Sequence, residues 1–424
     1  MQTRRSLLAT ALGVGAGSLA AVRETQAAGT GPWELSRLRR TPGHELKSTA
    51  TLTEAGVPIR LSELFYESEP WMDRPATRVF GYYARPVEAG DGRPLPAMVL
   101  VHGGGGKAFP EWARLWASRG YAALAMDLAG KGADGKPLPD GGPDQNDEWK
   151  FRRLKDGIKN AWPYHAVSAV IRCVSLLRTM PDVDADRVGI TGISWGGYLT
   201  NLVMSLDDRL KAAAPVYGCG FLHENSAWLP IFASLPAAEK QLWVENFDPS
   251  RYLERCRTPM LWVNGTHDFA YPLDSYRKSY QATRGRKTLC ITHKMPHGHP
   301  QGWAPSEIGR FVDSHFRPGP ENPPLARFGR LREEQGAVSV SVESELELRS
   351  GQLLWTADLS KPWQQREWRM AAATLSARGR DGVQMSAALP TSAPAAYFLT
   401  ATDSRGGTVS TEHRDLVPGE HSSR

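Results

Sequence analysis

The most constraining feature of this chain is the hexapeptide G-I-S-W-G-G at residues 192–197. An apolar run at 188–193 predicts a buried strand before it, and helical spacing begins near Gly196. A serine on so sharp a turn from strand to helix is held with its hydroxyl exposed, and the flanking glycines leave room for closely approaching backbone. The short pattern is common by chance, but its position between strand and helix is the one that a nucleophilic serine needs. We therefore expect Ser194 to be a catalytic nucleophile.

The chain around this turn alternates short apolar runs with helical patterns from about residue 79 to residue 315. Expected strands cover residues 79–84, 97–101, 121–126, 188–193, 210–216, 260–264 and 289–292, and expected helices cover 111–118, 163–180, a segment from 196 and 306–315. This alternation predicts an α/β fold with a mostly parallel sheet and helices on both faces. A long loop at 129–147 is expected to border the site, and residues 217–250 are irregular, as in an inserted cap.

A serine nucleophile needs a base, and the base needs an acid that orients it. In a fold of this kind the three follow in the order serine, acid, histidine. Asp268 comes directly after an expected strand, at the edge where active sites of open α/β sheets assemble, and Asp274 is the alternative acid. His297 and His299 both follow the last expected strand. We favour His297, whose distance from the strand suits a short loop, and keep His299 as the alternative base.

Acyl transfer also requires hydrogen-bond donors for the oxyanion that develops. Four glycines, residues 103–106, follow His102 at the end of an expected strand, so their amides can approach a reacting carbonyl. We expect one donor from Gly104 or Gly105 and the other from the amide of Trp195. His102 is expected to hold the loop by a hydrogen bond. The glycine run does not continue into Gly-Lys-Ser/Thr, which excludes a phosphate-binding loop.

With these motifs in this order, residues 75–317 resemble an α/β-hydrolase, close to acetylxylan esterases, dienelactone hydrolases and the catalytic domain of prolyl oligopeptidases. The resemblance implies Ser194 as nucleophile, Asp268 as acid and His297 as base, with the glycine loop as part of the oxyanion hole. Dienelactone hydrolases carry a cysteine where this chain has Ser194. Prolyl oligopeptidases carry a large β-domain ahead of the catalytic domain, and only about fifty residues are available for it here.

The leading hypothesis is therefore an exported serine esterase that cleaves small carboxylic esters, in particular acetylated carbohydrates, through an acyl-enzyme. Trp162, Trp228 and Trp303 lie near expected site loops and are candidates for stacking on sugar rings. One alternative is a peptidase or amidase that uses the same triad. Another is a protein that binds carbohydrates or cell surfaces and keeps a vestigial hydrolase domain. The acyl group, the alcohol and the oligomeric state are left open.

The two ends of the chain predict further segments. Arg4 and Arg5 precede a short apolar run to Val22, and small residues follow near Ala27, so residues 1–27 resemble a twin-arginine export signal. A membrane anchor is the alternative, but the run is short for a span. We expect cleavage and release to the periplasm or the medium. A cluster of Pro and Gly between 317 and 324 separates a hydrolase domain, 28–318, from a small Ig-like β-sandwich, 325–424.

Charge and cysteine content exclude other classes of function. The net charge is +6, but six Arg and only two Glu lie within the first forty residues, so the rest is nearly neutral and nucleic acid is not an expected partner. The cysteines show no spacing typical of a zinc site, and no metal or organic cofactor is expected. Their pairing is left open; they are Cys173, Cys219, Cys256 and Cys290.

Overall fold

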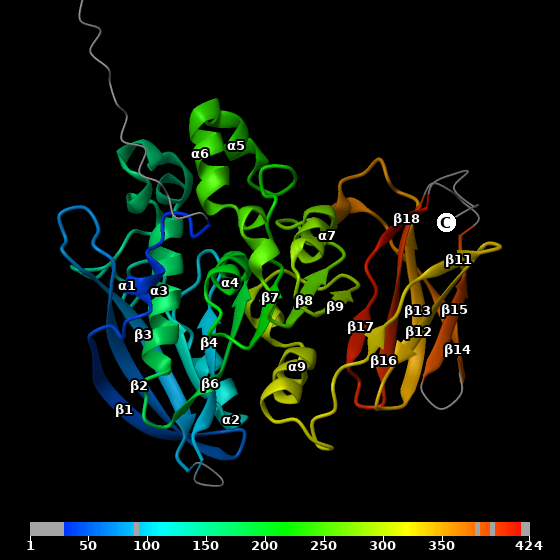
Figure 1. Cartoon of the computed structure of the whole chain (residues 1–424), viewed down its shortest axis with the longest axis horizontal. Helices are drawn as coiled ribbons and strands as arrows, with labels where there is room; N and C mark the ends of the chain where they lie inside the picture. The colour runs from blue at the N-terminus through cyan, green and yellow to red at the C-terminus, as the bar shows by residue number, and fades with distance from the viewer. Residues whose placement is uncertain (1–28, 89–92, 378–381, 391–394, 417–424) are drawn as a thin grey trace, which may run out of the picture.

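The computed structural model describes residues 29–88, 93–377, 382–390 and 395–416. The export signal predicted at 1–27 lies outside these ranges. Within them, every helix is too short or too polar to cross a lipid bilayer. Figure 1 shows an α/β body beside a group of C-terminal strands.

The α/β body is built on one twisted sheet. Its strands are β1 (His44–Glu54), β2 (Val57–Ser68), β3 (Thr77–Pro86), β4 (Leu95–Val101), β5 (Ala122–Met126), β6 (Val183–Ile193), β7 (Ala212–Val216), β8 (Met260–Gly265) and β9 (Lys287–Thr292). Pairing gives the spatial order β1-β2-β3-β5-β4-β6-β7-β8-β9, antiparallel up to β5 and parallel beyond it. Every residue of β4 and β5 is buried, as parallel strands covered on both faces require.

Helices cover both faces of this sheet, which confirms the predicted α/β-hydrolase architecture. They are α1 (Leu35–Leu38), α2 (Pro110–Ser118), α3 (Trp162–Leu177), α4 (Trp195–Leu206), α5 (Leu229–Ser234), α6 (Ala237–Phe247), α7 (Leu273–Ala282), α8 (His299–Trp303) and α9 (Ser306–Phe316). α3 and α4 pack together, and α2 meets α9 through Arg119 and Gly309. α5 and α6 form the irregular segment predicted at 217–250 and rise above the carboxyl end of the sheet (Figure 1).

The N-terminal hairpin of β1 and β2 was not predicted from the sequence. β1 is exposed along most of its length, so its side chains show no alternation of apolar and polar residues. The two strands are joined by Ala55 and Gly56, both with positive φ, which is the geometry of a two-residue hairpin turn. The sequence signal for this hairpin therefore lay in its turn residues rather than in a hydrophobic pattern.

The C-terminal strands form two further layers. They are β10 (Arg327–Phe328), β11 (Arg332–Glu334), β12 (Ala337–Glu343), β13 (Leu348–Thr356), β14 (Arg369–Ala377), β15 (Val383–Ala388), β16 (Ala395–Asp403), β17 (Thr408–Ser410) and β18 (Arg414–Leu416). β14 pairs with β13 through its first half and with β15 through its second half, so it passes from one layer to the other. Gly351 of β13 faces Met385 of β15, where a Cβ atom would lie 2.5 Å from the sulfur.

One of these layers continues the main sheet. β17 pairs antiparallel with β9 through Ser410 and Leu289. The amide of Thr408 also donates to Glu307 of α9 at 2.8 Å. The C-terminal strands therefore protect an edge of the catalytic sheet that would otherwise be open. The domain limits 28–318 and 325–424 stay a prediction.

Candidate active site

Ser194 occupies a strained turn between β6 and α4. Its backbone has φ +59° and ψ −116°, a conformation that residues other than glycine rarely adopt. Its amide donates to the Val216 carbonyl at 2.9 Å, which holds the turn against β7. A Cβ atom on Gly196 would lie 1.9 Å from the Val101 carbonyl oxygen, so glycine is required there. Strain of this kind, kept in place by the surrounding sheet, is typical of functional positions.

The structure brings His297 and Asp268 together. The Nδ1 atom of His297 lies 2.6 Å from Asp268 Oδ2. The other carboxylate oxygen, Oδ1, accepts hydrogen bonds from the amides of Ala270 at 2.9 Å and Tyr271 at 2.7 Å. The Asp268 side chain is almost completely buried, so its orientation is fixed. When Nδ1 donates to the carboxylate, Nε2 is left unprotonated, as a general base requires.

The alternative acid, Asp274, has a different role. Its oxygens accept hydrogen bonds from the side-chain amide of Asn225 at 2.8 and 3.0 Å and from the amide of Ser275 at 2.8 Å. Within the residues that the structure describes it forms no hydrogen bond or ion pair with a histidine. Asp268 is therefore the carboxylate that orients an imidazole.

The alternative base, His299, binds the glycine loop. Its Nε2 atom accepts a hydrogen bond from the amide of Gly103 at 2.9 Å. Burial, together with smaller effects of His102 and His297, lowers the pKa of His299 to about 4. No carboxylate orients it within the described part of the chain, and its ring packs on Phe109 at 4.8 Å. These contacts suit a positioning group rather than a proton acceptor.

The glycine loop lies directly against the nucleophile. A Cβ atom on Gly103 would lie 2.9 Å from the Cβ atom of Ser194. His102 holds the loop through both ring nitrogens, since Nδ1 lies 2.7 Å from the Gly103 carbonyl and Nε2 accepts from the Leu128 amide at 2.8 Å. Burial lowers the pKa of His102 to about 4, so this ring is neutral at ordinary pH.

The predicted oxyanion donors lie around this loop. A Cβ atom on Gly104 would come within 3.1 Å of the Trp195 ring, and Gly105 has φ +66° and faces open space. Trp195 is the first residue of α4, so its amide has no acceptor within the helix. Amides from both sides of Ser194 are thus available to a ligand.

The three tryptophans predicted to stack on sugars have different surroundings. Trp162 is fully buried and donates from Nε1 to the Leu128 carbonyl at 2.6 Å, so it is a core residue and the stacking role does not fit it. Trp303 is half-buried and packs on Trp112 with ring centroids 5.4 Å apart. Trp228 is also half-buried and lies 4.6 Å from the Trp195 ring. Trp228 is the one best placed to line the site.

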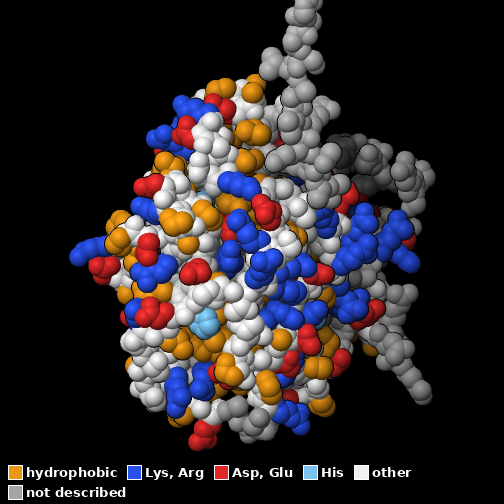
Figure 2. Space-filling model, turned by 60° about the vertical axis from the view of Figure 1, so that its left-hand side comes forward, with side chains coloured by type: hydrophobic (Ala, Val, Ile, Leu, Met, Phe, Trp, Pro, Cys, Tyr) orange, Lys and Arg blue, Asp and Glu red, His pale blue; other side chains and the backbone are white. Residues whose placement is uncertain are grey.

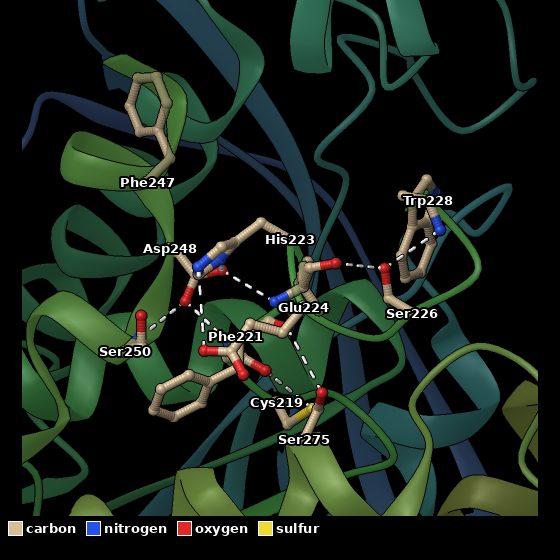
Figure 3. A network of polar contacts seen from close by, with 12 residues as sticks. Cys219, Phe221, His223, Glu224, Ser226, Trp228, Phe247, Asp248, Ser250 and Ser275 are labelled. Carbon is tan, nitrogen blue, oxygen red and sulfur yellow. Dashed lines mark hydrogen bonds and ion pairs between the residues drawn. The ribbon is translucent and has the colours of Figure 1, made fainter. Parts of the chain in front are cut away.

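A buried carboxylate fixes the loop that carries Trp228. Asp248 accepts hydrogen bonds from the amides of Phe221 at 2.8 Å, Leu222 at 3.0 Å and Ser250 at 2.9 Å. Ser226 then accepts from the Trp228 amide at 3.1 Å, as Figure 3 shows. The segment after β7 is therefore held by polar contacts rather than by regular secondary structure.

Tyr271 and Lys150 are side chains at the site that the sequence analysis missed. Tyr271 is fully buried, and its ring is parallel to that of His297 with the ring centroids 6.3 Å apart. Its hydroxyl lies near Ser194, although the geometry is not that of a regular hydrogen bond. Burial raises the pKa of this phenol well above its usual value, so it remains a proton donor. Lys150 is also buried, with its Nζ atom 4.8 Å from the centre of the Trp195 ring. Its burial lowers the pKa to about 8.

The position of Tyr271 three residues after Asp268 was the only local signal for it. No sequence pattern pointed to Lys150, because its contacts come from distant segments.

None of the four cysteines is suited to act as the nucleophile. All four are buried and unpaired. Burial raises the pKa of the Cys256 thiol to about 11 and raises those of the other three as well. A thiolate nucleophile needs the opposite shift.

Within the described residues no group of three or more His, Cys, Asp or Glu side chains could hold a metal ion.

Comparison with known proteins places the chain among esterases and related hydrolases. Residues 59–256 match the family model for acetyl xylan esterase (AXE1). The "Putative carboxymethylenebutenolidase" of Salmonella typhimurium is 33% identical over 56% of this chain and 74% of its own length. The acetyl esterase Axe7A of Xylanibacter ruminicola is 24% identical, and the match covers 46% of each chain. The chain spans less than half the length of the first curated relatives that it matches.

A solved structure shares the fold. The acetyl xylan esterase from Paenibacillus sp. R4 superposes with a TM-score of 0.55 over 66% of this chain and 92% of that one, at 22% identity.

Proposed function

The chain belongs to the α/β-hydrolase superfamily of serine hydrolases, in the family of the Salmonella relative, and from this premise we propose that it cleaves carboxylic esters through an acyl-enzyme. The observation that carries the proposal is the 2.6 Å contact between His297 and Asp268, on loops that follow β9 and β8. Ser194 follows β6 at the same edge of the sheet. A serine, an oriented imidazole and free amides are the parts that acyl transfer needs.

The reaction proceeds in two halves. In the first, Ser194 Oγ attacks the ester carbonyl while His297 Nε2 accepts its proton, and Asp268 stabilises the imidazolium. The amides of Trp195 and of Gly104 or Gly105 hold the oxyanion. The tetrahedral intermediate expels the alcohol, which takes the proton from His297. In the second half, His297 deprotonates a water that attacks the acyl-enzyme, which releases the acid and restores Ser194.

We further propose that the substrate is a small acyl ester of a carbohydrate, with acetate as the acyl group. The similarity to acetyl xylan esterases supports this substrate. So does an aromatic wall beside the nucleophile, in which Trp228 lies 4.6 Å from Trp195 and 5.1 Å from Tyr271. The twin-arginine pattern at 1–27 supports export, with action in the periplasm or outside the cell.

The nucleophile is tested by Ser194→Ala. Because triad members act as a unit, kcat on p-nitrophenyl acetate should fall by about 10⁴–10⁶. A fluorophosphonate should label the wild type stoichiometrically and leave the variant unlabelled. Ser205→Ala, in the helix α4 that follows Ser194, is the control and should keep both activity and labelling. A Ser194→Ala variant with more than a few per cent of wild-type activity would contradict the proposal.

The substrate class is tested with p-nitrophenyl esters of graded chain length, acetylated xylan and a proline p-nitroanilide. We expect the shortest esters and the acetylated polymer to be cleaved fastest. Faster cleavage of the anilide would favour the peptidase alternative instead.

A further inference from the structure

A cavity lies where the catalytic sheet meets the C-terminal strands, away from the candidate active site. Its volume is about 550 Å³, within the range of small-molecule sites. Three separate parts of the chain line it: the end of α7 with the start of β9, the segment at 326–331, and the segment at 409–414. The first residues of β9 line the cavity, whereas His297 lies beyond the last residue of β9. The cavity and the candidate active site therefore lie at opposite ends of this strand.

The cavity is strongly cationic. Five basic side chains line it with one acidic side chain, Glu412; the basic ones are Arg286, Lys287, Arg327, Arg330 and Arg414. Arg414 pairs with Glu412 at 3.5 Å, and Arg327 pairs with Glu343 at 3.6 Å. The other three form no ion pair within the described residues. Three cationic groups therefore remain free to bind an anion.

This concentration of charge is local rather than a property of the whole surface. After the first forty residues the chain is nearly neutral. On the face drawn in Figure 2, acidic side chains lie among the basic ones. The ratio of five basic side chains to one acidic side chain around the cavity is thus higher than the nearly neutral composition of the chain would give.

A buried donor also lines the cavity. Tyr280 is 3% exposed, and its hydroxyl has no hydrogen-bond partner within the described part of the chain. An unpaired buried polar group is unfavourable, and a ligand atom that accepts its hydrogen bond would remove that cost. Burial raises the pKa of this phenol, so it stays protonated and can donate to an oxygen.

We propose that this cavity binds a carboxylate-bearing oligosaccharide, that is, the uronic acid units of an acylated polysaccharide. The planar guanidinium group of Arg matches the geometry of a carboxylate, and the Tyr280 hydroxyl can donate a hydrogen bond to a sugar oxygen. A neighbouring hollow of about 390 Å³ shares Arg330 and adds Arg332, which extends the surface for a longer chain. A partly open cavity of this size, lined by a few separate cations, suits a few sugar units better than the continuous basic stripe of a nucleic-acid site does. The choice of a polysaccharide rests on the proposed function.

Binding of trigalacturonate to the full chain, measured by calorimetry, tests the proposal. We expect trigalacturonate to bind and uncharged xylotriose not to bind. The double variant Lys287→Ala with Arg330→Ala should weaken binding by at least about tenfold, and Tyr280→Phe should weaken it by a smaller factor. The control, Arg60→Ala with Arg349→Ala, removes two exposed cations outside the cavity and should bind as the wild type does. Turnover of p-nitrophenyl acetate should be unchanged in all of these variants.

The proposal fails if trigalacturonate does not bind, if xylotriose binds equally well, or if the double variant binds normally. Tighter binding of a single-stranded oligonucleotide or of phosphatidylglycerol vesicles would overturn the choice of a saccharide. If Ser194→Ala leaves ester hydrolysis intact while trigalacturonate binding still requires Lys287 and Arg330, the proposed function fails and the cavity assignment stands.

Discussion

At the scale of single residues, two histidines separated by one glycine have opposite surroundings. His297 lies in the loop before α8 and meets the carboxylate of Asp268. His299 is the first residue of α8 and accepts a hydrogen bond from Gly103. A carboxylate partner favours the imidazolium that forms in the reaction, whereas a backbone donor favours the neutral ring. The partners, rather than the residue type, therefore set the roles that we propose.

His297→Ala and His299→Ala should separate these roles. Loss of the base should lower kcat by about 10⁴ or more, because Ser194 then lacks a proton acceptor. Loss of His299 should cost about tenfold to a hundredfold through misplacement of the glycine loop. Initial rates on p-nitrophenyl acetate measure both, with thermal unfolding as the check that each variant is folded. An inactive His299→Ala beside an active His297→Ala would reverse the assignment.

Tyr271 provides a second prediction at this scale. Tyr271→Phe keeps the ring beside His297 and removes only the hydroxyl near Ser194. If that hydroxyl assists the reacting oxygen, kcat should fall about tenfold to a hundredfold while KM changes little. Fluorophosphonate labelling should slow without being abolished. Tyr276→Phe, a change in a fully buried tyrosine of α7, is the control, and equal kcat values in the two variants would exclude a role for Tyr271 in the reaction.

At the scale of elements, polar contacts help to join the C-terminal strands to the hydrolase. Arg310 of α9 makes two hydrogen bonds to Asp403, at the end of β16, one of them at 3.2 Å. The Asp403 side chain is only 2% exposed. Together with the pairing of β17 and β9, this contact fixes the position of the C-terminal layer against the catalytic sheet.

Arg310→Ala should therefore destabilise the protein by about 2–4 kcal/mol, because a buried carboxylate loses its cation. Lys361→Ala breaks a 3.1 Å pair with Asp358 whose side chains are both partly exposed, and should cost less than about 1 kcal/mol. Urea denaturation of the two variants measures the difference. Equal losses of stability in the two variants would mean that the hydrogen bonds from the amides of Arg405 and Gly407 are sufficient to stabilise the buried Asp403 carboxylate.

At the scale of the whole molecule, burial of histidines links stability to pH. Burial lowers the pKa values of His102, His165 and His299 to about 4 each. Between about pH 6.5 and pH 4 the unfolded chain therefore binds more protons than the folded chain at these sites. Asp127 acts in the opposite sense, because burial raises its pKa to about 6. Among these four groups the three histidines outweigh the one carboxyl, and the buried His413, whose pKa burial also lowers, adds to the net loss of stability in acid.

We expect the free energy of unfolding to fall by several kcal/mol, in order of magnitude, between pH 6.5 and pH 4, since one pKa unit corresponds to about 1.4 kcal/mol. Above pH 6.5 these three histidines should contribute no further change. His165→Phe removes one of the buried titrating rings and should flatten the profile, whereas His44→Gln changes an exposed ring and should not. Denaturant titrations at pH 7.5, 6, 5 and 4 measure this, and a flat profile for the wild type would refute the linkage.

The sequence by itself determined the elements whose signals are local. The apolar runs predicted the parallel strands, since strands buried on both faces must be apolar throughout. The glycines around Ser194 predicted the strained turn, because only a residue without a side chain tolerates backbone as close as the Val101 carbonyl is to Gly196. The order of serine, acid and histidine left two candidates for the acid, Asp268 and Asp274, and two candidates for the base, His297 and His299.

Only the tertiary structure decided which side chains meet. Asp268 rather than Asp274 faces His297, Trp162 is enclosed in the core, and Tyr271 lies beside Ser194. The hairpin of β1 and β2 and the pairing of β9 with β17 were likewise absent from the pattern of the chain. The reason is physical: a hydrophobic pattern encodes which face of an element is buried, whereas the direction of a loop side chain depends on packing against segments that lie far away in the sequence.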